Sequence, residues 1–239
     1  MTGSQILLIR DKCEIMNGLK RFVTSSIGRK VVMATTGLFL ISFLVVHCAV
    51  NALIFFDDGG QTFNIGAHFM GTNPVIRTIE VVLIIGFLIH IIQGLMIWWQ
   101  NKKARPISYS VKSESKNSTW YSRSMALLGT LLLLFLIVHT SNFWIPNRTH
   151  QFLHGDELPL YEMMIEKFQN PFQVLLYVFS CFLLFWHLLH GFKSAFQSLG
   201  INHRKYNALI LFLGVTFSYV IPFIMAMMPV AIYLDWIGE

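Results

Sequence analysis

The sequence predicts an all-α integral membrane protein with five transmembrane helices, and three observations support this fold class. The chain of 239 residues is 54% hydrophobic and only 13% charged, whereas a typical soluble domain is about 25% charged. Five apolar runs are each long enough to cross a bilayer, which takes about 20 residues in an α-helix. Lysine and arginine alternate between rich and poor connecting segments, as they do in multi-pass membrane proteins.

The apolar runs and the turn residues between them place the elements in order. We expect transmembrane helices over about residues 31–56, 74–99, 124–144, 171–196 and 206–234. Residues 1–30 are expected to form a cytoplasmic N-terminal segment, residues 31–234 the five-helix domain, and residues 235–239 an outer tail. Pro74 and Pro171 suit the first turns of the second and fourth helices, where a missing N–H costs nothing.

Two outer connections and the last helix have features of their own. Residues 63–71, FNIGAHFMG, are amphipathic and are expected to lie along the outer membrane interface. Residues 145–170 are expected to be a long outer segment with one short helix near residues 160–168. The fifth helix carries no histidine, and Pro222 and Pro229 are expected to kink it, so we interpret it as a packing or partner-facing helix.

The basic residues define the expected topology. Lysine and arginine gather in residues 10–30 (six), 102–123 (six) and 193–205 (three), and such zones face the cytoplasm in membrane proteins. The N terminus is therefore expected inside the cell and the C terminus outside. The net charge of +6 follows from this topology signal, and we do not interpret it as a sign of nucleic-acid binding.

A histidine-bearing motif occurs twice in the chain. Residues 33–47 read MATTGLFLISFLVVH and residues 125–139 read MALLGTLLLLFLIVH. The next apolar segment after each copy also carries a histidine followed four residues later by a glycine, first as His90 and Gly94 and then as His187 and Gly191. The chain therefore reads as two helix pairs, each with two membrane histidines at matching places.

The four histidines fall at two expected depths. Counted from the helix starts at 1.5 Å per residue, His47 and His139 lie about 24 Å along outward-running helices, in the outer part of a core about 30 Å thick. His90 and His187 each follow the opening proline of an inward-running helix by 16 residues. These two are therefore expected in the inner part of the membrane.

Paired histidines within membrane helices favour a haem-binding site. A haem iron takes two axial ligands, and neutral imidazole suits a b-type haem. We expect His47 with His139 to hold an outer haem and His90 with His187 to hold an inner one. No Cys-x-x-Cys-His motif is present, which excludes covalent c-type attachment. Glycines at matching offsets would leave room for the flat macrocycle: Gly37, Gly94, Gly129 and Gly191.

Other histidines and basic residues have secondary expected roles. His190 lies one turn from His187, but only His187 has the spacing to a glycine that His90 has, so His190 is expected to be a propionate or proton partner. Further candidate propionate partners lie at the inner helix ends: Arg29, Lys30, Arg123 and Lys193. The remaining histidines fall in segments predicted as loops and are expected to be solvated: His68, His150, His154 and His203.

Glu80 is an ionisable residue within the expected second transmembrane helix. It precedes His90 by ten residues, which is about 15 Å further outward and level with the outer haem. A carboxylate there could exchange protons with a quinone. The alternative is a structural ion pair with the nearby Arg77, and the sequence leaves both interpretations open.

Together these motifs resemble one known family. The matching pieces are Gly37…His47-Cys-Ala-Val-Asn51, Phe63-Asn-x-x-Ala-His-Phe-Met70, Pro74-Val-Ile-Arg77-x-x-Glu80, His90-x-x-x-Gly94, Arg123…Gly129…His139 and His187-x-x-x-Gly191. From Ser25 onward the chain resembles the cytochrome b membrane anchor of succinate dehydrogenases and fumarate reductases, in the prokaryotic type with one five-helix subunit and two haems.

The resemblance implies partners and a location. It implies bis-histidine ligation of two b haems, an iron–sulfur subunit near the inner haem, a flavoprotein subunit beyond it, and a quinone, expected to be menaquinone, near the outer haem and Glu80. It places the chain in the cytoplasmic membrane of a prokaryote, among lipids. One departure is Phe185, which stands where some diheme fumarate reductases carry a proton-conducting glutamate.

Two alternatives remain open at this stage. The repeat and the depths would also suit the diheme anchor of a hydrogenase or formate dehydrogenase, although the matches in the second helix and the outer loop argue against it. A transporter without haem, built from repeats, would instead predict broken helices with charged sites at the midplane, whereas these helices carry histidines and few charges.

Overall fold

The structure, a computed structural model, describes residues 18, 21, 22, 24–56, 58–104, 120–201 and 203–237. All of the elements described there are helical: α2 (Ser26–Asn51), η1 (Ala52–Phe55), α3 (Gln61–Thr72), α4 (Pro74–Lys103), α6 (Trp120–Arg123), α7 (Met125–His139), η2 (Thr140–Trp144), α8 (Ile145–His154), α9 (Leu160–Phe168), α10 (Pro171–Ser198) and α11 (Asn207–Tyr233). Most of the expected N-terminal segment, residues 105–119 of the expected inner connection and the last two residues of the outer tail lie outside the described residues.

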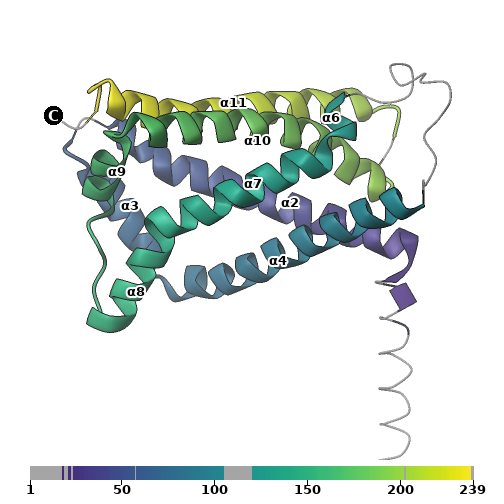
Figure 1. Cartoon of the computed structure of the whole chain (residues 1–239), viewed down its shortest axis with the longest axis horizontal. Coiled ribbons are helices and arrows are strands. Elements are labelled where there is room, and N and C mark those ends of the chain that lie inside the picture. Colours follow the sequence, from purple (N-terminus) through teal and green to yellow (C-terminus); the bar gives the residue numbers. More distant parts are fainter. Residues whose placement is uncertain are drawn as a thin grey trace, which may run out of the picture.

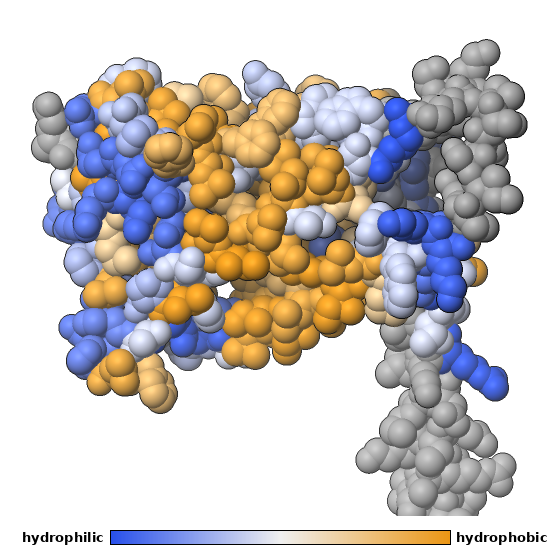
Figure 2. Space-filling model, viewed as in Figure 1, coloured by the Kyte–Doolittle hydropathy of each residue, from blue (hydrophilic) through white to orange (hydrophobic). Residues whose placement is uncertain are grey.

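Five helical stretches are long and apolar enough to cross a membrane: Ser26–Phe55, Pro74–Lys103, Met125–His154, Pro171–Ser198 and Asn207–Tyr233. Figure 2 shows an apolar band between two polar ends. Many large apolar side chains of the long helices are exposed, among them Leu175 at 67% and Phe212 at 65%. Such apolar faces suit lipid, which cannot hydrogen-bond but accepts hydrocarbon. The prediction of an all-helical, multi-pass membrane protein is confirmed to this extent.

The second and fourth membrane helices begin at the predicted prolines. In α4 the side chain of Asn73 accepts hydrogen bonds from the backbone N–H groups of Val75 and Ile76. In α10 the side chain of Asn170 accepts a hydrogen bond from the N–H of Phe172. Each Asn-Pro pair combines a capping side chain with a residue that needs no N–H partner.

The third membrane helix is longer than predicted. The expected end at residue 144 is wrong, because the chain continues through the π-helical turn η2 into α8 and stays helical to His154. Pro146 offers a physical reason. A proline has no N–H to donate and its ring crowds the carbonyl four residues earlier, and a wider π turn relieves this without ending the helix. His150 and His154, expected in a loop, therefore lie on α8, and His68 lies on α3.

Two short helices cover one end of the bundle, which we call the α3–α9 end (Figure 1). The expected interfacial segment at residues 63–71 forms α3, and the expected short helix near residues 160–168 forms α9. Phe63 and Tyr161 bring α3 and α9 together, with ring centroids 6.4 Å apart. Gly60 has a left-handed φ of 81° and approaches so closely that a β-carbon there would lie 2.3 Å from the Tyr161 ring. Only glycine suits this turn.

The long helices pack around α10. This helix contacts α2, α7 and α11, while α4 packs along α2 and meets α7. Figure 1 shows α11 lying along α10 on the outside of the other helices. A β-carbon at Gly214 of α11 would lie 2.6 Å from the ring of Phe192, so the small residue allows the two helices to approach closely. Pro222 and Pro229 lie inside α11 and are both buried.

Candidate functional site

His47 and His139 lie opposite each other, toward the α3–α9 end of the bundle. His47 is near the end of α2 and His139 is the last residue of α7. The centroids of their rings are 5.7 Å apart and the ring planes are nearly perpendicular, at 87°. Each ring stacks on a phenylalanine one turn earlier in its own helix, Phe43 and Phe135 respectively. We call His47 and His139 the first histidine pair.

His90 and His187 form a second histidine pair, in α4 and α10. Their ring centroids are 6.4 Å apart. Gly37 of the first motif copy lies against this pair, since a β-carbon there would be 3.4 Å from Cε1 of His90. Gly129 of the second copy lies against His187 in the same way, at 3.7 Å. In each motif the histidine belongs to one pair and the glycine lies beside the other pair.

The other expected site residues have different surroundings. A β-carbon at Gly94 would lie 3.3 Å from the Met33 methyl group, whereas at Gly191 it would meet open space. The His190 ring packs 6.3 Å from that of Tyr121, whereas the ring that faces His90 is that of His187. Four basic candidates lie at the ends of their helices opposite the α3–α9 end, one partly buried and three exposed: Arg29, Lys30, Arg123 and Lys193.

The two pairs fit an iron held between imidazoles. Imidazole nitrogens bind metals at about 2 Å and the ring centre lies about 1 Å further, so two imidazoles on opposite sides of one iron would have centres roughly 6 Å apart. The measured separations are 5.7 and 6.4 Å. All four histidines are only partly buried by protein. No group of three or more His, Cys, Asp or Glu side chains in the described residues could hold a metal ion, but a haem iron needs only two protein ligands.

The four Nδ1 atoms have unequal surroundings. Nδ1 of His90 lies 3.3 Å from the Thr36 hydroxyl, and Nδ1 of His47 lies 3.5 Å from the amide nitrogen of Asn51. Nδ1 of His139 and Nδ1 of His187 are buried with no hydrogen-bond partner. A neutral imidazole has one ring N–H and one acceptor nitrogen. If the other nitrogen bound iron, Nδ1 would carry the proton.

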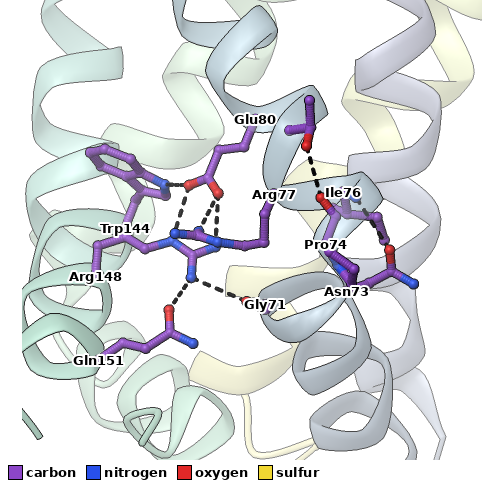
Figure 3. A network of polar contacts seen from close by, with 10 residues as sticks. Gly71, Asn73, Pro74, Ile76, Arg77, Glu80, Trp144, Arg148 and Gln151 are labelled. Carbon is purple, nitrogen blue, oxygen red and sulfur yellow. Dashed lines mark hydrogen bonds and ion pairs between the residues drawn. The ribbon is translucent and has the colours of Figure 1, made fainter. Parts of the chain in front are cut away.

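Glu80 lies in a polar cluster that ties α4 to η2 and α8 (Figure 3). Its carboxylate accepts hydrogen bonds from Nε and Nη2 of Arg148, at 3.0 and 3.1 Å, and from Nε1 of Trp144, at 2.5 Å. Arg77 also donates to it. The Arg77 pair was one of the two sequence interpretations, whereas Arg148 and Trp144 were missed. The one available signal was that Arg148 lies outside the three basic zones.

Arg148 extends the cluster toward α3. Its Nη1 donates to the carbonyl of Gly71, at 3.4 Å, and to the side chain of Gln151. Beside it lies an open groove of about 320 Å³, lined by Trp144, Ile145, Arg148, Thr149, Phe152 and Leu153. Trp144 and Arg148 both line the groove and bond the Glu80 carboxylate, so they link the groove to this carboxylate. Phe152 is 89% exposed, so much of this surface is open and apolar.

Several polar residues near the histidines were not predicted from the sequence. The Asn142 amide donates to the Tyr177 hydroxyl, at 3.0 Å, and to Gln173, at 3.2 Å. The Tyr177 ring lies 5.8 Å from that of His139. Gln93 is 7% exposed and its amide nitrogen has no partner. The available signal for all of them was a polar residue within or beside an apolar run.

An aromatic group lies next to the second pair. The Trp186 ring packs 5.0 Å from Trp120 and 5.4 Å from Tyr121. Its Nε1 is buried without a hydrogen-bond partner, and the next residue in the chain is His187. An indole N–H in such a place is a free donor for a bound group.

Comparison of the chain with protein-family models, with curated proteins and with solved structures finds no match.

Proposed function

We propose that this chain is the diheme cytochrome b anchor of a succinate dehydrogenase or fumarate reductase, passing electrons between an iron–sulfur subunit and a membrane quinone. The observation that carries the proposal is the presence of two facing histidine pairs with ring separations of 5.7 and 6.4 Å. The specific enzyme family is supported by the sequence resemblance alone.

In this proposal His47 and His139 hold one b haem, and His90 and His187 hold the other. Bound haem supplies reversible one-electron transfer. The chain supplies the imidazoles, the apolar surroundings and the close approach that Gly37 and Gly129 allow. Trp186, Gln93 and His190 lie within a turn of a second-pair histidine on the same helix, and the first two have free buried N–H groups. These would serve as donors to the polar edge of the inner haem.

The basic zones orient the proposed complex. The bundle end opposite α3 and α9 would face the cytoplasm, following the distribution of lysine and arginine. The second histidine pair is the nearer one to that end. The iron–sulfur subunit, with its flavoprotein partner, would dock there and exchange electrons with the inner haem.

The Glu80 cluster and its groove are the proposed quinone site. The exposed apolar residues of α8 would accept an isoprenoid quinone, and Arg148, whose Nη2 uses only one of its two hydrogens on Glu80, would offer an N–H donor to a carbonyl oxygen. Glu80 now accepts hydrogen bonds from two guanidinium groups and an indole. To move a proton it would first have to release one of these donors, so its role as a proton carrier stays a prediction.

The first test is haem quantification in the purified chain. We expect two b haems per polypeptide in a dithionite-reduced minus oxidised spectrum, with one haem lost or altered in each of His47→Ala and His187→Ala. His203→Ala is the matched control, because this exposed histidine lies in the turn before α11, and it should keep both haems. A chain without haem would overturn the proposal.

A second test separates the proposed complex from related ones. The diheme anchor of a hydrogenase or formate dehydrogenase would use the same histidine pairs. The complex is therefore purified from membranes with its partner subunits, and succinate, formate and hydrogen are each tried as reductants of the haems. Reduction by succinate is expected. Reduction by formate or hydrogen alone would replace the proposed family with the corresponding one.

A further inference from the structure

One of the four site histidines has a side-chain acceptor from another helix beside its Nδ1. The hydroxyl oxygen of Thr36, in α2, lies 3.3 Å from Nδ1 of His90, in α4. The same hydroxyl lies 2.8 Å from the carbonyl of Val32 and 3.2 Å from that of Met33. Because its proton goes to one of these carbonyls, the oxygen presents a lone pair to the imidazole.

Only the first copy of the repeated motif supplies this contact. Thr36 directly precedes Gly37, and the equivalent residue before Gly129 is Leu128. Gly129 lies against His187 as Gly37 lies against His90. Leu128 is 3% exposed and apolar, and Nδ1 of His187 is buried without a partner. The second pair thus contains one imidazole with an acceptor and one without.

The first pair lacks an equivalent acceptor. The amide nitrogen of Asn51 lies 3.5 Å from Nδ1 of His47 but donates to the carbonyl of His47, at 2.8 Å. The side chain therefore turns a donor toward this ring. Asn51 corresponds to Phe143 in the second copy, and Nδ1 of His139 has no partner. The Thr36 arrangement is consequently confined to the second pair.

We propose that Thr36 is a positioning residue that lowers the reduction potential of the haem held by His90 and His187. The inference rests on the proposed function. With iron on Nε2, the Nδ1–H of His90 would donate to Thr36, and such a bond makes a ligating imidazole a stronger electron donor. A stronger donor stabilises the oxidised iron relative to the reduced iron. The bond would also hold the His90 ring in a fixed orientation against α2.

The test is a redox titration of the purified complex with both haems bound. In Thr36→Val the branched shape is kept and the acceptor is removed. The equilibrium constant for reducing the second-pair haem should rise about tenfold, which for one electron is about 59 mV. The first-pair haem is the internal reference and should not move. Thr36→Ser should restore the wild-type potential, because it keeps the hydroxyl.

Thr35 offers a matched control. It is exposed, and its hydroxyl also bonds back to its own helix, 3.0 Å from the carbonyl of Val31. Thr35→Val should leave both potentials unchanged. An equal shift in Thr35→Val and Thr36→Val, or an equal shift of both haems, would overturn the inference, because it would indicate a general effect on α2.

A second variant keeps the test decisive if Thr36→Val loses its haem. Leu128→Thr places a hydroxyl at the equivalent position near His187 and leaves Thr36 intact. The potential of the second-pair haem should then fall, and an unchanged or raised potential would overturn the inference. Absence of haem from the wild-type chain would instead overturn the proposed function, so the two failures are distinguishable.

Discussion

At the scale of single residues, small and charged side chains decide what the bundle interior can hold. Gly37 lies 3.4 Å, measured from an added β-carbon, from the ring of His90. Glu80 accepts hydrogen bonds from Arg77 in its own helix and from Trp144 and Arg148, which are distant in sequence. The first residue provides space next to a ring and the second provides a fixed electrostatic contact, so their substitutions should have different effects.

Enlarging Gly37 should damage the second histidine pair selectively. Gly37→Ala adds one methyl group at ordinary van der Waals distance and should keep both haems. Gly37→Leu would push further atoms into the His90 ring, because a packed interior has no slack for them. We expect loss of one of the two haems, measured by haem content per chain. Two haems in Gly37→Leu would contradict this account of the glycine.

Removing the charge of Glu80 should lower the stability of the folded chain. In Glu80→Gln two guanidinium groups lose their carboxylate, and breaking hydrogen bonds to charged groups costs about 1.5–3 kcal/mol. The melting temperature in detergent should fall. Glu162→Gln, at an exposed position of α9, is the control and should change it little.

A double-mutant cycle between Glu80 and Arg148 would test their coupling. If the two single variants and the double variant lower the melting temperature additively, the ion pair contributes nothing. The rate of quinone reduction by the Glu80→Gln complex, measured at unchanged haem content, separates a role at the proposed quinone site from a purely structural one. Loss of activity at full haem content would support a role at that site, and full activity would leave Glu80 purely structural.

At the scale of elements, helix ends are determined by short polar motifs. Asn73-Pro74 and Asn170-Pro171 begin α4 and α10 with the same capping geometry. α3 begins in another way, since the Asp58 carboxylate accepts a hydrogen bond from the N–H of Thr62, at 2.8 Å. Hydrogen bonds from the Thr62 side chain and backbone hold the pKa of Asp58 below its usual value.

The start of α3 should therefore depend on pH. Because folding lowers the pKa of Asp58, its contribution to stability is present above the usual aspartate value and is lost as the pH falls through the lowered value. Amide hydrogen exchange at Thr62 should accelerate there beyond the intrinsic pH effect. In Asp58→Asn the extra pH dependence should vanish. Persistence of that dependence in the variant would assign it to another group.

At the scale of the whole molecule, an apolar band separates two polar ends (Figure 2). The α3–α9 end carries the Glu80 cluster and the groove, and the opposite end carries most of the described basic residues. From the positive-inside rule we expect the basic end to face the cytoplasm. The two histidine pairs then lie at different depths along the direction of proposed electron transfer.

Thiol labelling in intact cells tests this orientation. Single cysteines are placed at two exposed residues, Glu162→Cys in α9 and Lys205→Cys in the turn before α11, in a chain with Cys13 replaced by serine. The native Cys48 and Cys181 are buried. A membrane-impermeant reagent should label Glu162→Cys from outside and Lys205→Cys only after permeabilisation. The reverse pattern would invert the proposed topology.

The sequence by itself determined the five membrane helices, two of their starting points and the repeated histidine motif. These depend on local properties: apolar runs longer than a bilayer requires, asparagine caps before proline, and a spacing that recurs. The predicted levels of the histidines followed from helical rise alone, because a continuous α-helix converts residue number directly into distance.

Only the tertiary structure decided which side chains meet across helices. Arg148 reaches Glu80 over 68 positions in the sequence, because a π turn carries the third helix past Pro146, where propensity predicts an end. The Thr36 contact with His90 spans 54 positions and depends on how α2 and α4 are rotated against each other. Such rotations are set by packing summed over whole helices, which no local motif encodes.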